Sequence, residues 1–205
     1  MIRHHPSDAT LMAYAGGTLP EGLAVVLATH LTQCPTCRSA IGAAETMGGL
    51  LLESLPPAEM AMDFAVVERL LERADDEPPR APPVLNPGLA PPLDRVRLGR
   101  WWPVGRGIRW RFIEAGGAAM AGLVHVQPGR SIPRHGHVGL ELTCLLSGVL
   151  VDAGVEYHHG DIAEPASDHD SPPVATGDEP CVCAVAFEGM RFRGVLGLVQ
   201  RLGGW

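Results

Sequence analysis

A run of prolines in the middle of the sequence limits what this chain can fold into more than any other feature. Residues 77–92, EPPRAPPVLNPGLAPP, contain seven prolines in sixteen positions. Proline lacks a backbone N–H and fixes φ, so this segment favours an extended chain over a helix or a central strand. We therefore expect a linker over residues 77–95, between one domain at residues 1–76 and a second at residues 96–205.

The segment before the linker has the periodicity of helices. Ser7 is placed to cap a short first helix. The sequence TLPE, residues 18–21, has the pattern of a capping box before a second helix, in which apolar residues recur at helical spacing up to Leu31. Pro35 suits the first turn of a third helix that runs toward Leu55. The first domain is therefore predicted to be a small helical bundle.

A fourth helix is predicted directly before the linker, over residues 56–77. One stripe of this helix carries Met60, Phe64, Val67 and Leu71. An amphipathic helix in this position either packs on its own domain, which is the simpler expectation, or grips a partner protein.

After the linker the sequence changes to short runs of β-type residues, broken by Gly, Pro, Asn or Asp. Their spacing, on the order of one strand per ten to fifteen residues, is typical of an antiparallel sandwich or barrel. The predicted strands lie at residues 96–99, 108–115, 120–127, 141–152, 156–164, 181–187 and 190–199. The fold class is therefore a multidomain α + β protein, helical first and antiparallel β second.

A histidine and two cysteines in the first half have the spacing of metal ligands. His30 and Cys34 are four residues apart, so they share one face of a helix. Cys37 follows in a Cys-x-x-Cys pattern, which lets two sulfurs converge on one ion. Zinc takes four such ligands in a tetrahedron. The fourth is expected from the start of the chain, where His4 and His5 both stand.

Two other interpretations of these residues compete with a zinc site. A lone Cys-x-x-Cys can be a redox pair of the thioredoxin type, but the βαβ context of that motif is missing here. The cysteines can also be plain core residues, since a free thiol packs as a small hydrophobe. The histidine four residues upstream favours zinc over both alternatives, although thiolates would leave such a site open to oxidation.

The first half also resembles a known family. The pattern His-x3-Cys-x2-Cys, with an N-terminal histidine and a helical segment of this size, resembles the zinc-containing anti-sigma domain. The longer match, RHHPSDATLMAYAGGTLPEG followed by ATHLTQCPTCR, resembles the ChrR-type anti-sigma factors in particular. This resemblance implies a zinc site made by His5, His30, Cys34 and Cys37. The choice of His5 over its neighbour rests on the resemblance alone.

A second set of metal-type residues lies in the β half. Residues 129–148 read GRSIPRHGHVGLELTCLLSG, in which His135, His137 and Glu141 differ by even numbers. Along an extended chain these three side chains can face the same side. The segment resembles the first cupin motif, G-x5-H-x-H-x3-E-x6-G, at every fixed position. The resemblance implies a cupin domain, a jelly-roll or double-stranded β-helix barrel.

The second cupin motif is matched less closely. Residues 160–173 read GDIAEPASDHDSPP, where the interval from glycine to proline is one residue short and Ser167 replaces a glycine. We expect His169 to be the fourth ligand, with His158 and His159 as rivals. Three histidines and a carboxylate accept zinc, iron, manganese or nickel. The family resemblance favours zinc, so the cofactor is zinc or another divalent transition metal.

The remaining cysteines carry no metal motif. Cys144 has the opposite parity to Glu141 and should lie away from the metal face, so no role is assigned to it. Cys181 and Cys183 should face one side of a strand. They are either small buried residues or a pair of thiols that can be oxidised together.

The charge and hydropathy of the sequence limit the classes of partner that the protein can bind and where it can be located. The net charge is −7, and residues 1–76, with ten acidic and four basic side chains, carry −6 of it. This balance disfavours a nucleic-acid binder. The acidic residues either steer a basic protein partner or keep the helices soluble. No stretch has the roughly 20 apolar residues that cross a bilayer, and the first residues lack the apolar core of a signal peptide. We expect a cytoplasmic protein.

Taken together, the resemblance implies an anti-sigma factor rather than an enzyme. The helical domain would bind and inhibit an extracytoplasmic-function sigma factor, without direct contact to nucleic acid or membrane. The cupin domain would be needed to sense oxidative stress, such as singlet oxygen or organic peroxides, and to release the sigma factor, with proteases acting on release. The alternative is a cupin metalloenzyme, dioxygenase-like, with a regulatory zinc-binding head. A DNA-binding regulator is disfavoured by the charge.

Overall fold

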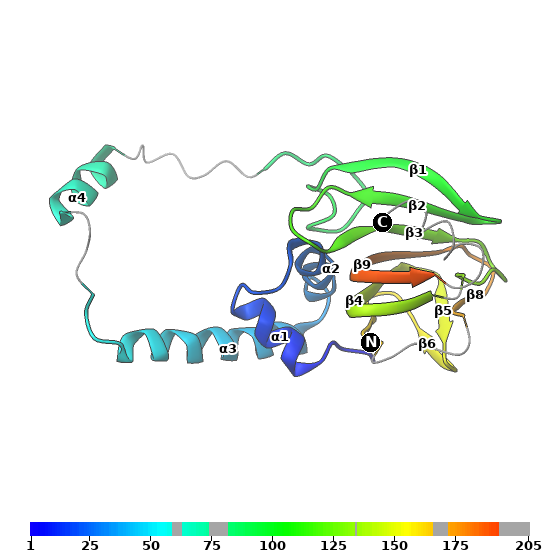
Figure 1. Cartoon of the computed structure of the whole chain (residues 1–205), viewed down its shortest axis with the longest axis horizontal. Helices are drawn as coiled ribbons and strands as arrows, with labels where there is room; N and C mark the ends of the chain where they lie inside the picture. Colours follow the sequence, from blue (N-terminus) through cyan, green and yellow to red (C-terminus); the bar gives the residue numbers. More distant parts are fainter. Residues whose placement is uncertain (59–62, 74–81, 134, 166–171, 193–205) are drawn as a thin grey trace.

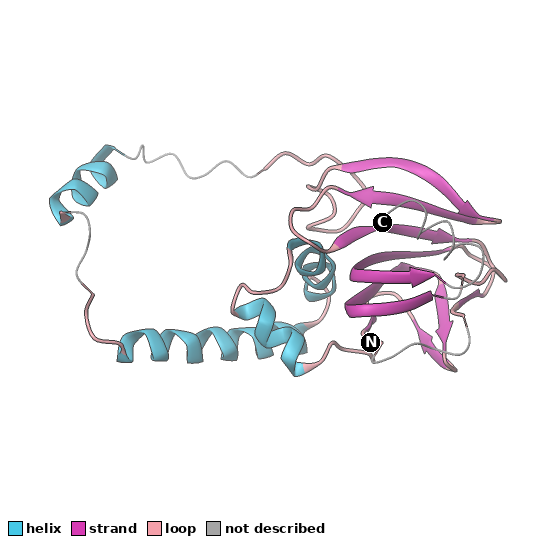
Figure 2. Cartoon of the chain, in the orientation of Figure 1, coloured by secondary structure: helices cyan, strands magenta, loops and turns pink. Residues whose placement is uncertain are grey.

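The computed structural model describes residues 1–58, 63–73, 82–133, 135–165 and 172–192 (Figure 1). Helices and strands occupy opposite ends of the molecule (Figure 2), which confirms the predicted fold class. The helices are α1 (Asp8–Ala15), α2 (Glu21–Leu31), α3 (Pro35–Ser54) and α4 (Phe64–Arg73). The strands are β1 (Leu98–Gly105), β2 (Ile108–Ile113), β3 (Met120–Val126), β4 (His135–Ser147), β5 (Val149–Asp152), β6 (Val155–Tyr157), β7 (Ile162–Ala163), β8 (Val174–Thr176) and β9 (Cys181–Phe192).

Two of the three predicted helix starts are confirmed. Ser7 is the N-cap of α1, and its Oγ accepts a hydrogen bond from the Thr10 N–H at 3.2 Å. Pro35 is the first residue of α3. Its N-cap is Cys34, whose Sγ accepts from the Cys37 N–H at 3.4 Å. The second cysteine of the pair is therefore held by the helix start itself.

The predicted capping box before α2 is wrong. The N-cap is Pro20, and no side chain caps this helix. The Thr18 hydroxyl instead donates to the Ala13 carbonyl at 3.2 Å. Glu21 Oε2 accepts from the Gly116 N–H at 2.6 Å, in the loop before β3. A partner distant in sequence has taken the carboxylate that a capping box would use.

The fourth helix is shorter than predicted, and it does not pack on its own domain. Helix α4 begins at Phe64 within the predicted range 56–77, whereas Met60 lies outside the described residues. In the described part of the chain α4 stands away from the other helices and the sheets (Figure 1). Phe64, Leu70 and Leu71 are exposed. The expectation of packing on its own domain is wrong, and the alternative of a partner stays a prediction.

The strands form two antiparallel sheets with a core between them. One sheet has six strands in the order β1-β2-β3-β9-β4-β7, and the other has three in the order β6-β5-β8. The core between the sheets contains Ile108, Val124, Val126, Leu145, Leu150, Ala175, Cys181, Cys183, Val185 and Phe187. The two sheets thus enclose an apolar interior, as the sequence pattern of a sandwich or barrel predicts. Strand β8 was not predicted, because three residues give too little periodicity.

A second core joins the helices to the other face of the six-stranded sheet. From the helices it contains Leu11, Leu23, Val26, Leu27, Leu31, Cys34, Cys37 and Ile41. From the sheet it contains Ile113, Ala121, Leu123, Leu142, Cys144, Ile162, Ala184 and Ala186. Neighbouring residues of β4 alternate between the two cores, as Cys144 and Leu145 show. The central strands of this sheet, β3, β9 and β4, are thus covered on both faces.

Helix α2 makes the closest approach to the sheet. A Cβ atom added at Gly22 would lie 3.1 Å from the Ala119 carbonyl oxygen and 3.1 Å from the Ala121 Cβ. Ala121 is held in the sheet between Ile113 of β2 and Ala186 of β9. A glycine at this point lets the helix backbone rest almost directly on β3.

Candidate metal centre

Four predicted ligands of the helical half come together in the structure. One ligand atom from each of His5, His30, Cys34 and Cys37 lies within 4.8 Å of all the others. His30 Nε2 is 3.4 Å from the Cys37 Sγ. His5 Nδ1 is 3.4 Å from the Cys34 Sγ and 3.3 Å from the Cys37 Sγ. Within the described residues, this is the one such group of histidine, cysteine or acidic side chains.

The hydrogen bond made by His30 Nδ1 determines which ring nitrogen carries the proton. Nδ1 lies 2.7 Å from the carbonyl oxygen of Gly160, and a carbonyl can only accept a hydrogen bond. Nδ1 therefore carries the proton and Nε2 presents its lone pair to the cluster. The side chain is fully buried, and this burial lowers the pKa of His30, so the ring is neutral. A neutral imidazole with one nitrogen tied is the form that binds metal.

The buried Cys37 thiol needs a nearby cation to ionise. Burial raises the pKa of Cys37 to about 12, and the neighbouring Cys34 thiol acts in the same direction. A bound divalent ion reverses this preference because it stabilises thiolates directly. Two sulfurs and two imidazole nitrogens in a closed, mostly buried cluster match the ligand set of structural zinc sites. The residues present therefore fit a zinc ion.

The structure distinguishes the two adjacent N-terminal histidines. His5 points its Nδ1 to both cysteines, as described above. The ring of His4 lies instead against Tyr157 of β6, with ring centroids 4.6 Å apart. Sequence spacing alone could not distinguish His4 from His5 as the ligand, because two consecutive residues can reach the same region of space.

In the β half, two predicted ligands face each other on β4. His135 Nε2 lies 3.9 Å from Glu141 Oε2, and both side chains are about nine-tenths buried. His135 Nδ1 is 2.7 Å from the carbonyl oxygen of Pro133 and therefore carries the proton. In this tautomer Nε2 carries the lone pair and is the nitrogen on the side of Glu141.

The other two predicted ligands of this half stay predictions. His137 lies on β4, but its side chain is outside what the structure describes, and His169 lies outside the described residues altogether. The alternation of side chains between the two faces of β4, on which the prediction of a shared metal face depends, is also interrupted. The β4–β9 register shifts between Val138 and Glu141, where Gly139 has a φ of 76°. The bulge could not be predicted from parity, because it depends on pairing with β9.

The rival histidines have partners of their own. His158 Nε2 is 3.7 Å from Glu156 Oε2 on an exposed surface. His159 Nδ1 is 2.6 Å from the carbonyl oxygen of Leu146 and donates to it. Both belong to the turn between β6 and β7.

The three remaining cysteines are buried and divided between the two cores. Cys144 lies in the core shared with the helices, so its predicted position away from the metal face is confirmed, and burial raises its pKa to about 12. Cys181 and Cys183 do share one side of β9, with sulfurs 3.5 Å apart in the barrel core. Their joint oxidation stays a prediction.

Fold and site together define a class: a small helical head with a two-histidine, two-cysteine cluster, packed on a cupin-type barrel. Residues 95–190 match the family model described as the ChrR Cupin-like domain. The chain is 38% identical over 204 residues to the anti-sigma-E factor ChrR of Cereibacter sphaeroides, across 95% of this chain and 94% of that protein. It is also similar to the crystal structure of Rhodobacter sphaeroides SigE in complex with the anti-sigma ChrR, with 38% identity and a TM-score of 0.74 over 91% of this chain and 99% of that one. The chain belongs to the ChrR family of anti-sigma factors.

Proposed function

We propose that this protein binds an extracytoplasmic-function sigma factor and keeps it from core RNA polymerase. The observation that carries this proposal is the similarity to ChrR along nearly the whole chain, including both the helices and the barrel. ChrR has been crystallised with SigE, and the matching fold supports the same kind of partner here. A binding role of this kind needs no catalytic residue, and we assign none.

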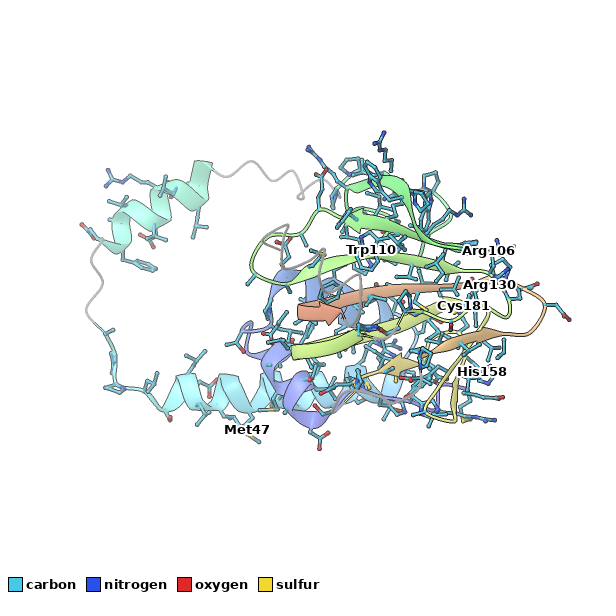
Figure 3. The ribbon with its side chains drawn as sticks, turned by 45° about the vertical axis from the view of Figure 1, so that its right-hand side comes forward. Met47, Arg106, Trp110, Arg130, His158 and Cys181 are labelled. Carbon is cyan, nitrogen blue, oxygen red and sulfur yellow. The ribbon has the colours of Figure 1, made fainter. Side chains whose placement is uncertain are left out.

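Exposed apolar side chains on α3 and α4 support a protein partner at the helical end. They are Met47, Leu50, Leu51, Leu52, Leu55, Phe64, Leu70 and Leu71. Figure 3 shows Met47 on α3, well away from the barrel. Large apolar side chains gathered on extended helices cost free energy in water and are typical of an interface. The acidic residues predicted to steer a basic partner lie in the same half of the chain.

In this proposal zinc at the N-terminal cluster has a structural role. His5 comes from the segment before α1, His30 from α2, and Cys34 and Cys37 from the start of α3. A bound zinc ion would crosslink these segments and so order the start of α3 for the proposed partner. His5, His30, Cys34 and Cys37 would supply four protein ligands, the number that closed structural zinc sites use.

The barrel is proposed to act as the sensor. His135, His137, Glu141 and His169 would hold zinc or another divalent transition metal there. Oxidative stress, such as singlet oxygen or organic peroxides, would change the barrel, release the sigma factor and expose the protein to proteases. The described helices include none long and apolar enough to cross a membrane. The proposed partner, a transcription subunit, supports a cytoplasmic protein without a direct nucleic-acid or membrane ligand.

The test is complex formation with purified extracytoplasmic-function sigma factors of the source organism. We expect one of them to form a stable complex and to lose transcription activity with core RNA polymerase. Leu51→Asp should weaken that complex at least tenfold, because it places a charge in an apolar contact. The matched control is Val155→Asp, an exposed apolar residue on the barrel, which should bind as the wild type does. Failure to bind any sigma factor, with oxygen consumption by the iron-loaded protein, would support the metalloenzyme alternative.

A further inference from the structure

The β6–β7 turn of the barrel contacts the N-terminal cluster directly. His158 marks this turn at the edge of the barrel in Figure 3. Two residues on, the Gly160 carbonyl accepts the 2.7 Å hydrogen bond from His30 Nδ1. His30 is separated from Gly160 by 130 residues, so this bond exists only because the helices dock on the barrel. It fixes both the tautomer of His30 and the direction of its Nε2.

The next residue of the turn anchors the start of the chain. Asp161 Oδ1 accepts from the N–H groups of Arg3 at 2.7 Å and His4 at 3.1 Å, and Oδ2 accepts from the His158 N–H at 2.9 Å. The His4 carbonyl accepts in turn from the Ile162 N–H at 3.3 Å. Burial alone would raise the pKa of Asp161, but these backbone donors hold it below its ordinary value. The carboxylate is therefore a charged acceptor beside the residue that precedes His5.

A second carboxylate grips the chain on the other side of His5. Glu164 Oε2 accepts from the Ser7 N–H at 2.7 Å. Glu164 Oε1 accepts from the Ser7 hydroxyl at 2.8 Å and from the Thr10 hydroxyl at 3.0 Å. His5 thus lies between two anchor points, and both belong to the barrel.

We propose that residues 158–164 of the barrel position ligands of the N-terminal metal site and so belong to that site. The Gly160 carbonyl orients His30, while Asp161 and Glu164 hold the segment that delivers His5. Two of the four metal ligands are positioned by the barrel, so the barrel sets how tightly the helical half retains its metal. This inference rests on the proposed metal role of the cluster. It gives a change inside the barrel a direct physical route to the helices that carry the exposed apolar surface.

Gly160 permits a discriminating substitution. Its φ is +87°, and an added Cβ would lie 3.1 Å from both Gln33 Oε1 and Ile2 Cδ1, in the helical half. Gly154, in the β5–β6 turn, has a φ of +82° and nothing within 4 Å of an added Cβ. Alanine at either position carries similar backbone strain. Only at Gly160 does it also crowd side chains of the helical half, those of Gln33 and Ile2.

The probe is Co²⁺, added to the metal-free full-length protein. The N-terminal cluster offers two thiolates, whereas the barrel motif offers histidine and carboxylate, so thiolate-to-cobalt charge-transfer absorption reports the N-terminal site alone. We expect Gly160→Ala to weaken Co²⁺ binding at this site by about 10-fold, the lower end of the effect of losing a partner of a metal-bound histidine, because strain and crowding in the turn shift the Gly160 carbonyl relative to His30 Nδ1. Gly154→Ala should stay within about twofold of wild type, because it leaves that partner in place. Equal affinities in the two variants would overturn the proposal.

Carboxylate variants give a second measurement. Asp161→Asn and Glu164→Gln keep the side-chain size and weaken the two anchors, so Co²⁺ should pass to an added chelator faster than in wild type. Asp178→Asn, at an exposed carboxylate of the β8–β9 turn, is the matched control and should leave the rate unchanged. Glu164 is only partly buried, so its variant is informative even where Asp161→Asn folds poorly. Wild-type release rates in both anchor variants would contradict the proposal.

The cobalt measurements involve no sigma factor, so the two proposals can fail separately. A wild-type protein that binds Co²⁺ through thiolates and responds to Gly160→Ala, yet captures no sigma factor, would overturn the proposed function alone. A wild-type protein without the thiolate-to-cobalt band would overturn the metal site and, with it, this inference.

Discussion

The close contact between α2 and β3 gives a sharp test of how the helices dock on the barrel. In Gly22→Ala the new Cβ would lie 3.1 Å from the Ala119 carbonyl oxygen and from the Ala121 Cβ. Ala121 is paired on both sides, to β2 and β9, so it cannot move aside without disturbing three strands. Overpacking of this kind costs about 1–3 kcal/mol.

The higher helix propensity of alanine offsets part of this overpacking cost. Glycine to alanine in a helix interior stabilises by about 1 kcal/mol, and by less at the second residue of a helix, where Gly22 stands. We therefore expect a net loss of about 1–2 kcal/mol in the free energy of unfolding, as the overpacking cost exceeds the propensity gain. For a chain of this size that lowers Tm by roughly 2–8 °C. The measurement is urea denaturation, followed by circular dichroism, together with a thermal scan.

Gly42→Ala is the matched control for Gly22→Ala. Gly42 lies inside α3 with nothing within 4 Å of an added Cβ. This variant should gain about 1 kcal/mol and raise Tm by about 2–4 °C. Opposite signs in the two variants are the expected result. If Gly22→Ala were stabilised as much as Gly42→Ala, α2 would not be pressed against β3 in solution.

Three further outcomes are expected. Cys34→Ser and Cys37→Ser should each lower the zinc content by about one ion per chain, measured by atomic emission after desalting; unchanged zinc would remove the thiols from the site. Cys144, with its pKa raised to about 12 by burial, should have a thiolate fraction at pH 8 roughly a thousandfold below that of an exposed thiol. It should therefore resist iodoacetamide until urea unfolds the protein, and prompt labelling would contradict its burial. His135→Ala combined with Glu141→Ala should remove metal from the barrel and leave the thiolate-to-cobalt band intact, whereas loss of that band would mean that the two sites are not distinct.

The parts of the site that could be predicted from sequence depend on local geometry. The four-residue spacing of His30 and Cys34 predicts one face of a single helix. In the structure α2 ends at Leu31 and Cys34 is the N-cap of α3, so that detail is wrong, but the Cys34 N–H still donates to the His30 carbonyl at 3.0 Å and keeps the two residues close. Pro35 marks the helix start that brings Cys37 back to them. In the same way, strict alternation along β9 put Cys181 and Cys183 on one side. Each of these conclusions needs only a helix or a strand.

The parts that could not be predicted depend on contacts between distant segments. Glu21 has the spacing of a capping residue, yet Gly116 takes its carboxylate. No sequence signal connects His30 with Gly160, because a backbone carbonyl carries no side-chain identity. The bulge near Gly139 likewise arises from pairing with β9. Tertiary structure overrides local preference at each of these points.

The apolar outer face of the six-stranded sheet determines how the protein behaves after proteolytic cleavage. Leu123, Leu142 and Ile162 lie under the helices rather than in water. Cleavage within the proline-rich segment would therefore leave two fragments still bound to each other, since their shared interior survives the break. An isolated barrel would expose this apolar face to water and would tend to self-associate.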